Sequence, residues 1–332
     1  MSRPLDGKVA VVAGATRGAG RGIARALGEA GAFVYCTGRS VRGNPATPGR
    51  RETIDETAEM IVAAGGHALA VRVDHSKPPE VEALFLHVRD EKGHLDVLVN
   101  DIWGGDEITE WKPFWTLETA KGFQMLDSAV RTHIVTSRYG APLMIAQRAG
   151  LIVEITDGDH AGYRGSLFYD LAKMAAIRLA ADMAADLHNS GVTALAVTPG
   201  FLRSEAVLEK LGVTEETWRN AIPKRKEFAE SETPLYVGRA VAALAADPDV
   251  RRKSGQVWAS WTLAKEYRFT DADGRQPDFG AYVERSITEI LDRGGPSSED
   301  ERFWIDAWHT SFLNEPKWAA LVARMGKALK KR

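Results

Sequence analysis

The sequence predicts an α/β fold in which a doubly wound parallel sheet of about seven strands carries helices on both faces. Two observations support this prediction. Short β-branched or apolar runs alternate with longer stretches of helical spacing, which is the pattern of repeated βαβ units. Strand segments such as Leu95–Val99 are almost continuously apolar, and this composition is typical of parallel strands that helices cover on both sides.

The expected elements follow one another as this fold requires. Strands are predicted, in chain order, at Lys8–Ala13, Phe33–Thr37, Ala68–Val73, Leu95–Val99, Leu151–Ile155, Val192–Thr198 and Gln256–Ser260. Apolar residues recur at helical spacing between them, and helices are predicted near Gly20–Ala30, Ile54–Ala64, Pro78–Lys92, Gly122–Arg148, Phe168–Ser190 and Leu235–Ala246. Gly, Pro and Arg dominate Arg39–Arg51, which predicts a loop after the second strand.

Two further stretches do not fit the alternation. Residues 101–116 follow the fourth strand and contain three tryptophans, which form either the wall of a substrate pocket or ordinary packing. After residue 265 the chain continues with tryptophans at helix-like spacing. We therefore expect one α/β domain over residues 1–265 and a helical extension over residues 266–332, which packs on this domain or on a neighbouring subunit.

Composition and charge argue against several classes of protein. The chain is 44% hydrophobic and 27% charged, which is ordinary for a folded globular protein. Its formal charge of −2 gives no overall field that would attract nucleic acid or an anionic membrane. No apolar run approaches a membrane span, and the first residues lack the apolar segment of a secretory signal. We expect a cytoplasmic protein without nucleic-acid or membrane partners, in which the lone Cys36 is a core residue.

A glycine-rich turn connects the first strand to the first helix. A strand, turn and helix of this kind bind the diphosphate of a dinucleotide, because glycines let the backbone approach the phosphates and the helix N-terminus offers free N–H groups. The turn therefore predicts a sheet of the Rossmann type. The candidate cofactor contacts in it are Gly14, Thr16, Arg17, Gly18, Ala19 and Gly20.

The end of the second strand indicates which dinucleotide is bound. An NAD-preferring fold usually has a carboxylate about 20 residues after the turn, where it holds the ribose 2′-hydroxyl. Here that place holds Gly38 and Arg39, and both Arg39 and Arg17 could reach a 2′-phosphate. Arginine binds phosphate through bidentate, charge-assisted bonds, so NADP(H) is the expected cofactor. The alternative is that both arginines are solvated surface residues.

Tyr169 and Lys173 are the candidate chemical centre. They lie four residues apart at the start of a predicted helix, so their side chains share one face. A free tyrosine, with a pKa near 10, exchanges protons poorly at neutral pH. A cation about 5 Å away contributes about 3 kcal/mol at an effective dielectric near 20, which lowers that pKa by roughly two units.

Taken together, these motifs resemble the short-chain dehydrogenase/reductase family over residues 5–265. Further positions that match the family's motifs are Asp74 after the third strand, Asn100 at the fourth, Pro199 and Gly200 after the sixth, and Ser204 in the usual threonine position. The resemblance implies that all of these contact the cofactor, with Asp74 at the adenine. It also implies that Tyr169 is the general acid/base, that Lys173 lowers its pKa and holds the nicotinamide ribose, and that the protein forms a homodimer or homotetramer.

The chain departs from the family pattern at the site itself. Alignment of the fifth strand puts Thr156 and Asp157 where the family has a serine pair, and Ala129 where it has a proton-relay asparagine. An ionised Asp157 would raise the pKa of Tyr169 and oppose the oxyanion. Asp157 is therefore either protonated, so that it donates a hydrogen bond as serine would, or turned away, which leaves the task to Thr156. Both residues are candidate catalytic groups.

The sequence predicts an NADP(H)-dependent oxidoreductase that interconverts a carbonyl and an alcohol on an apolar or aromatic small molecule. Hydride would pass between the nicotinamide and the substrate carbon while Tyr169 exchanges the proton. The alternative is a cofactor-binding sensor or scaffold with weak or no turnover. The missing serine and asparagine favour that alternative, and the Tyr169–Lys173 pair disfavours it. The histidines lack ligand-like spacing, so no metal site is expected.

Overall fold

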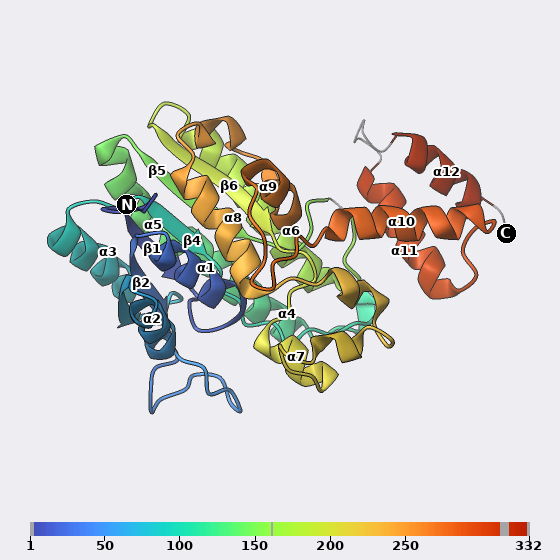
Figure 1. Ribbon diagram of the computed structural model, residues 1–332, viewed down its shortest axis with the longest axis horizontal. Coiled ribbons are helices and arrows are strands. Elements are labelled where there is room, and N and C mark those ends of the chain that lie inside the picture. Colours follow the sequence, from blue (N-terminus) through green and yellow to red (C-terminus); the bar gives the residue numbers. More distant parts are fainter. Residues whose placement is uncertain (1–2, 161, 313–318, 331–332) are drawn as a thin grey trace.

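A parallel sheet forms the centre of the structure, a computed structural model that describes residues 3–330 apart from residue 161 and residues 313–318 (Figure 1). Its seven strands lie in the order β3-β2-β1-β4-β5-β6-β7. They are β1 (Val9–Ala13), β2 (Phe33–Gly38), β3 (His67–Arg72), β4 (Val97–Asn100), β5 (Gly150–Ile155), β6 (Val192–Thr198) and β7 (Val257–Ala259). The chain winds outward from β1 in one direction and from β4 in the other, so the predicted doubly wound Rossmann-type fold is confirmed.

Helices cover both faces of the sheet (Figure 1). Alternate strand residues point toward each of the two helical layers. On one face lie α1 (Gly18–Glu29), α2 (Ile54–Ala63) and α8 (Pro234–Ala246). On the other lie α3 (Pro78–Lys92), α5 (Thr132–Gln147) and α6 (Leu167–Asp186). Because both faces of the central strands are buried, both sets of alternating residues are apolar, which explains the continuous apolar runs in the sequence.

The helix predicted at Gly122–Arg148 is interrupted. It consists of α4 (Thr119–Leu126), a π-helical segment at Asp127–Arg131, and α5. Apolar spacing does not reveal a π-helical segment, because one extra residue in a turn leaves the pattern on either side intact. Such segments are frequent at functional sites, and this one carries Ala129.

Several short elements between the strands are absent from the predicted set. The helix α7 (Glu205–Leu211) has seven residues, too few to show a helical period. Short 3-10 turns lie at Phe114–Thr116, Trp218–Ala221, Lys226–Glu230 and Val250–Lys253.

Among the described residues, four helices follow β7. They are α9 (Ser260–Tyr267), α10 (Phe279–Asp292), α11 (Glu299–Phe312) and α12 (Ala319–Leu329). The last three share an apolar cluster of their own and lie beside the sheet rather than over its faces (Figure 1). Its buried members are Ile287, Ile305, Leu321 and Met325. No helix in the described part of the chain is long and apolar enough to cross a membrane.

Removing residues 300–332 should lower the melting temperature or change the oligomeric state. The deletion takes Ile305, Leu321 and Met325 away from Ile287 and leaves an apolar face of α10 uncovered. Calorimetry and gel filtration test this, and an unchanged melting curve and elution volume would show that α11 and α12 are an independent appendage. A matched pair refines the test: Ile305→Ala should cost about 2–5 kcal/mol of local stability because Ile305 is fully buried, whereas Trp304→Ala, at 50% exposure, should cost little.

Candidate active site

The glycine-rich turn between β1 and α1 is built so that a side chain cannot be accommodated. Gly14 has a φ of +96°, and a Cβ atom there would lie 2.4 Å from the carbonyl oxygen of Asp101. A Cβ atom on Gly20 would lie 2.3 Å from the carbonyl oxygen of Gly14. The turn therefore leaves the N-terminus of α1 at the carboxyl edge of the sheet, with Gly18 as its first residue. A backbone cradle of this shape fits a dinucleotide diphosphate.

A carboxylate of this chain lies on that helix N-terminus. Oε2 of Glu205, the first residue of α7, accepts a hydrogen bond from the backbone N–H of Gly18 at 2.8 Å. Oε1 of the same carboxylate lies 3.7 Å from the guanidinium of Arg21. One turn further along α7, Glu209 pairs with Arg50 at 2.6 Å, which joins the loop after β2 to α7. Glu205 thus takes the place in which a bound phosphate would be expected.

Replacing Glu205 by Ala should tighten NADPH binding by about three- to tenfold, because the variant no longer places a competing anion on Gly18. Fluorescence titration measures this. Glu216→Ala is the matched control, since that exposed glutamate only bonds Thr214 at 2.7 Å. An unchanged dissociation constant for Glu205→Ala would mean that its carboxylate does not compete with the phosphates.

The groups expected at the adenosine end lie close together. Arg39 follows β2 as an exposed residue, and Nη2 of Arg17 donates to Oγ1 of Thr47 at 3.3 Å. Oδ1 of Asp74 accepts hydrogen bonds from the backbone N–H and the hydroxyl of Ser76, at 3.1 and 2.6 Å. Burial acts to raise the pKa of Asp74, but these bonds and the charge of Arg39 lower it. No carboxylate stands directly at the end of β2 to repel a 2′-phosphate.

Tyr169 and Asp157 are in direct contact. The Tyr169 hydroxyl donates a hydrogen bond of 2.6 Å to Oδ2 of Asp157, at the carboxyl end of β5. Burial, together with the charge and hydrogen bond of Asp157, raises the pKa of Tyr169 well above its ordinary value. Desolvation and the neighbouring carboxylate act against the lowered pKa that the sequence analysis expects from Lys173, and that expectation stays a prediction.

Lys173 lies under an aromatic ring. Its Nζ is 4.1 Å from the ring centroid of Trp103 and 5.6 Å from that of Tyr169. Burial lowers the pKa of Lys173, although the charges of Asp157, Asp101 and Asp106 oppose this. Across the described residues, its ammonium group forms no hydrogen bond or ion pair, so it is free to bind a ligand hydroxyl.

Thr156 has a different set of contacts from Asp157. Its side chain is buried, and its hydroxyl donates to the backbone carbonyl of Lys173 at 2.7 Å. Thr156 thus fixes the first turns of α6, which carry Tyr169 and Lys173, to the end of β5. Ser204 caps α7 by accepting from the backbone N–H of Val207 at 3.4 Å.

A buried polar chain under the site was not expected from the sequence. Asn100 and Glu154 are neighbours across β4 and β5, and Nδ2 of Asn100 donates to Oε1 of Glu154 at 2.6 Å. Oε2 of Glu154 lies 2.6 Å from Nδ1 of His133 on α5. Nε2 of His133 lies 3.0 Å from the backbone carbonyl oxygen of Ile102. Asn100 is fully buried, and its expected contact with the cofactor stays a prediction.

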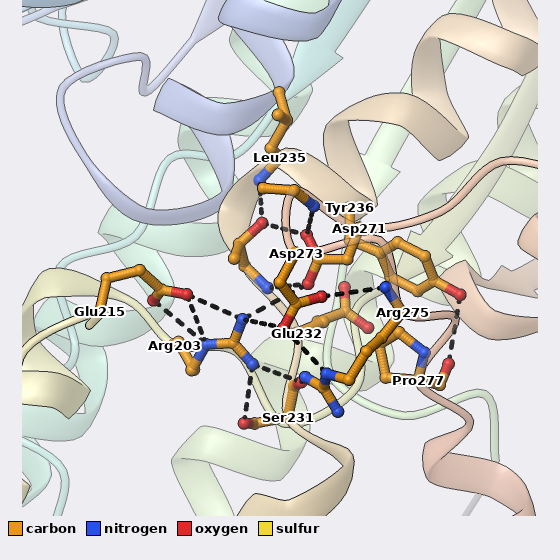
Figure 2. A network of polar contacts seen from close by, with 12 residues as sticks. Arg203, Glu215, Ser231, Glu232, Leu235, Tyr236, Asp271, Asp273, Arg275 and Pro277 are labelled. Carbon is orange, nitrogen blue, oxygen red and sulfur yellow. Dashed lines mark hydrogen bonds and ion pairs between the residues drawn. The ribbon is translucent and has the colours of Figure 1, made fainter. Parts of the chain in front are cut away.

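A second buried network holds the segment after β6 (Figure 2). The guanidinium of Arg203 donates to Glu215 at 3.0 Å and to the carbonyl of Ser231 at 2.6 Å, and it lies 3.5 Å from Asp271. Glu232 accepts hydrogen bonds from the backbone N–H of Gly200 at 2.8 Å and from Ser260 at 2.6 Å. Burial raises the pKa of Glu232 to about 8. The network fixes the Pro199–Ser204 segment from beneath.

Aromatic side chains gather around the Tyr169 ring. Its centroid lies 5.5 Å from Trp103 and 5.4 Å from Trp111. The loop after β5 in turn contacts the C-terminal helices, because the rings of His160 and Trp308 are 4.5 Å apart. Tyr163 and Phe303 form a second, looser contact at 6.3 Å. Burial, with Arg164 nearby, lowers the pKa of His160 to about 4.

Known proteins confirm the family. The sequence profile described as short chain dehydrogenase matches residues 8–212. The chain belongs to the short-chain dehydrogenase/reductase family. Among the described residues, no three or more His, Cys, Asp or Glu side chains are grouped so that they could hold a metal ion.

Relatives extend over nearly the whole chain. Dehydrogenase/reductase SDR family member 1 from Mus musculus is 34% identical over 328 residues, which cover 97% of this chain and 98% of the relative. The Homo sapiens protein of the same name is also 34% identical, over 96% of this chain and 97% of its own length. A metagenomic short-chain oxidoreductase solved in complex with NADP superposes with a TM-score of 0.57 at 27% identity, covering 74% of this chain and 94% of that one. This short-chain dehydrogenase/reductase is therefore an oxidoreductase of a family that uses NAD or NADP.

Proposed function

We propose that this protein is an NADP(H)-dependent reductase that converts a carbonyl group on an apolar or aromatic small molecule into an alcohol. The contact between Tyr169 and Asp157 carries the proposal, because it holds a protonated phenol at the carboxyl edge of the sheet. A phenol with a raised pKa stays protonated at neutral pH and suits the donation of a proton to a carbonyl oxygen. The aromatic rings of Trp103 and Trp111 support a flat, apolar substrate beside it.

The residues present fit the dinucleotide. The glycine cradle accommodates a diphosphate, Arg17 and Arg39 favour the 2′-phosphate, and the free ammonium of Lys173 suits a ribose hydroxyl. Asp74, Pro199, Gly200 and Ser204 are the remaining proposed contacts. When bound, NADPH supplies the hydride that this chemistry requires.

Proton transfer is the part of the reaction that this chain performs. Tyr169 donates its hydroxyl proton to the carbonyl oxygen as the substrate carbon is reduced. An aliphatic alcohol is a weaker acid than a phenol, so the oxygen of the forming alkoxide is the stronger base and takes the proton. Because that single proton is hydrogen-bonded to Asp157 in the structure, the hydroxyl must turn from Asp157 to the carbonyl oxygen before the transfer. Lys173 stabilises the tyrosinate that remains. Thr156 contributes by holding α6 rather than by contact with the substrate.

The second candidate is a cofactor-binding sensor with little turnover. The absence of serine at position 157 favours it, as does Glu205 on the cofactor's phosphate site. A panel of carbonyl compounds and alcohols, followed by the absorbance of reduced nicotinamide, separates the two. Turnover that Tyr169→Phe abolishes supports the reductase, and tight NADPH binding without turnover supports the sensor.

NADPH should bind at least tenfold more tightly than NADH. That preference requires about 1.4 kcal/mol from the arginine contacts. Titration of both nucleotides, first with the unaltered protein and then with Arg39→Ala, measures it. Arg89→Ala is the control, because that exposed arginine lies in the last turn of α3 and pairs with its neighbour Asp90 at 2.7 Å. Equal affinities for the two nucleotides would contradict the assignment of Arg39 and Arg17.

We also propose a homo-oligomer. Large apolar side chains remain exposed on the helices α4, α5 and α6, where relatives of this family commonly associate. They include Phe123, Ile134 and Leu171, which are 60%, 50% and 46% exposed. Burial of these side chains between copies would remove an apolar surface from water.

A further inference from the structure

The buried pair of His133 and Glu154 occupies the surroundings of the missing asparagine. Ala129, His133, Lys173 and Ile102 line one small cavity, and the π-helical segment carries Ala129 to it. Family members have a proton-relay asparagine at position 129, but alanine can neither donate nor accept a proton. His133 lies one helical turn further along the chain and supplies the imidazole of the cavity wall.

The contacts of the imidazole fix where its protons lie. The Ile102 carbonyl can only accept, so Nε2 of His133 carries a proton. At the other nitrogen, a single proton lies between Nδ1 and Oε2 of Glu154, which are 2.6 Å apart. His133 and Glu154 are 3% and 0% exposed, so the pair exchanges protons with water only by way of the cavity or an opening of the structure.

Resting on the proposed reductase function, we propose that the His133–Glu154 pair replaces the relay asparagine and returns a proton to Lys173 in each turnover. The protons balance as follows. Tyr169 loses its hydroxyl proton to the new alcohol, and Lys173 protonates the tyrosinate. The pair then protonates the Lys173 amine through the cavity and takes one proton from solvent. One proton is thus consumed for each hydride transferred.

Other charged groups at the cavity are arranged to support this transfer. Asp101 also lines it, and burial raises the pKa of Asp101 to about 7, while Lys173 and His133 act in the opposite direction. A carboxyl group that titrates near neutrality can pass a proton in either direction. The charges of Asp106 and Asp157 also act on Lys173 and oppose the lowering of its pKa by burial. His133 acts through Lys173 and is therefore a positioning residue, as is Glu154.

Kinetics of Glu154→Gln and His133→Leu test the relay. Both variants should lower kcat about tenfold or more and raise the solvent deuterium isotope effect on kcat, because the return of the proton becomes rate-limiting. NADPH affinity should stay within about twofold of the unaltered protein, because the described hydrogen bonds of the pair go to Asn100 and Ile102 and not to the phosphate-binding turn. Adding Ala129→Asn to His133→Leu should recover much of the lost rate.

The control and the contrary outcomes are specific. His75→Gln removes an equally buried histidine, which bonds Thr37 and Thr136 instead, and should leave the isotope effect unchanged. A loss of kcat with an unchanged isotope effect and pH profile would overturn the relay, because it would show that the pair only holds Ile102 in place. Full activity in both variants, or no recovery with Ala129→Asn, would also overturn the relay.

A measurement on the protein without cofactor separates this inference from the proposed function. Nitrogen-15 NMR of the His133 ring should show both nitrogens protonated or sharing protons at neutral pH, and Glu154→Gln should remove the proton from Nδ1. Identical ring spectra would overturn the proton-sharing pair, whether or not the protein turns over a carbonyl compound. Absence of turnover in the unaltered protein would instead contradict the reductase.

Discussion

Replacing Tyr169 by Phe should lower kcat for carbonyl reduction by about 10²–10⁴-fold, the range that general acid catalysis contributes. The substitution removes only the hydroxyl that donates to Asp157 at 2.6 Å and keeps the ring that packs against Trp103 and Trp111. NADPH affinity and the melting temperature should therefore change little. Steady-state rates with a substrate from the carbonyl panel, together with nucleotide titration, measure the two effects separately.

Tyr163→Phe is the matched control for this prediction. Tyr163 belongs to the loop between β5 and α6 and is 40% exposed, and its ring contacts Phe303 rather than the catalytic pair. Its variant should retain most of the activity. If Tyr169→Phe and Tyr163→Phe lowered the rate equally, the assignment of Tyr169 as the proton donor would be wrong.

Replacing Asp157 by Asn should shift the pH dependence of the reaction by about 1–3 pH units, the effect of one charge in contact with a titrating group. Asp157 raises the pKa of Tyr169, so its removal lowers that pKa. The reductive rate requires protonated Tyr169 and should therefore begin to fall at a lower pH in the variant. The oxidative rate requires the tyrosinate and should begin to rise at a lower pH. Near neutrality, the fraction of Tyr169 present as tyrosinate should be about 10- to 1000-fold larger in the variant.

Rates of carbonyl reduction and of alcohol oxidation, measured from pH 6 to 10, test this predicted shift. Thr156→Val is the control, because it removes a hydroxyl that bonds the α6 backbone and leaves the charge at Tyr169 unchanged. It should lower stability without moving the profile. A profile that Asp157→Asn leaves in place would show that Asp157 is protonated when the enzyme works, which is the first of the two alternatives drawn from the sequence.

The sequence was sufficient for the strands and for the motifs that depend on neighbouring residues. Each strand was predicted within two residues at either end, because apolar runs and turns are local patterns. The glycine turn and the spacing of Tyr169 and Lys173 are local as well. The effect of Asp157 on the pKa of Tyr169 was anticipated, but burial, the largest cause of the raised pKa, is not revealed by any spacing in the sequence.

The contacts that escaped prediction join distant parts of the chain. His133 and Glu154 are 21 residues apart and lie on a helix and a strand whose packing brings them together. One sign was visible: Glu154 stands in an otherwise apolar strand, where a buried carboxylate needs a partner. Glu205 gave no such sign, because a glutamate at the start of a short helix is ordinary and its bond to Gly18 spans 187 positions.

The Arg203 network affects how this protein can be divided. Arg203 is 1% exposed, and Asp271 and Arg275 join it from beyond residue 265, where the sequence had placed the boundary of the α/β domain. A chain ended at that boundary would leave a buried guanidinium short of a carboxylate, which costs about 3–5 kcal/mol and falls directly on the segment that follows Gly200. The chain belongs to the α/β domain at least as far as Pro277, whose carbonyl accepts a hydrogen bond from the Tyr236 hydroxyl at 3.2 Å. An exchange of α10–α12 would therefore also alter the site, because Phe279 stacks on Phe201 and the ring of Trp308 lies 4.5 Å from that of His160.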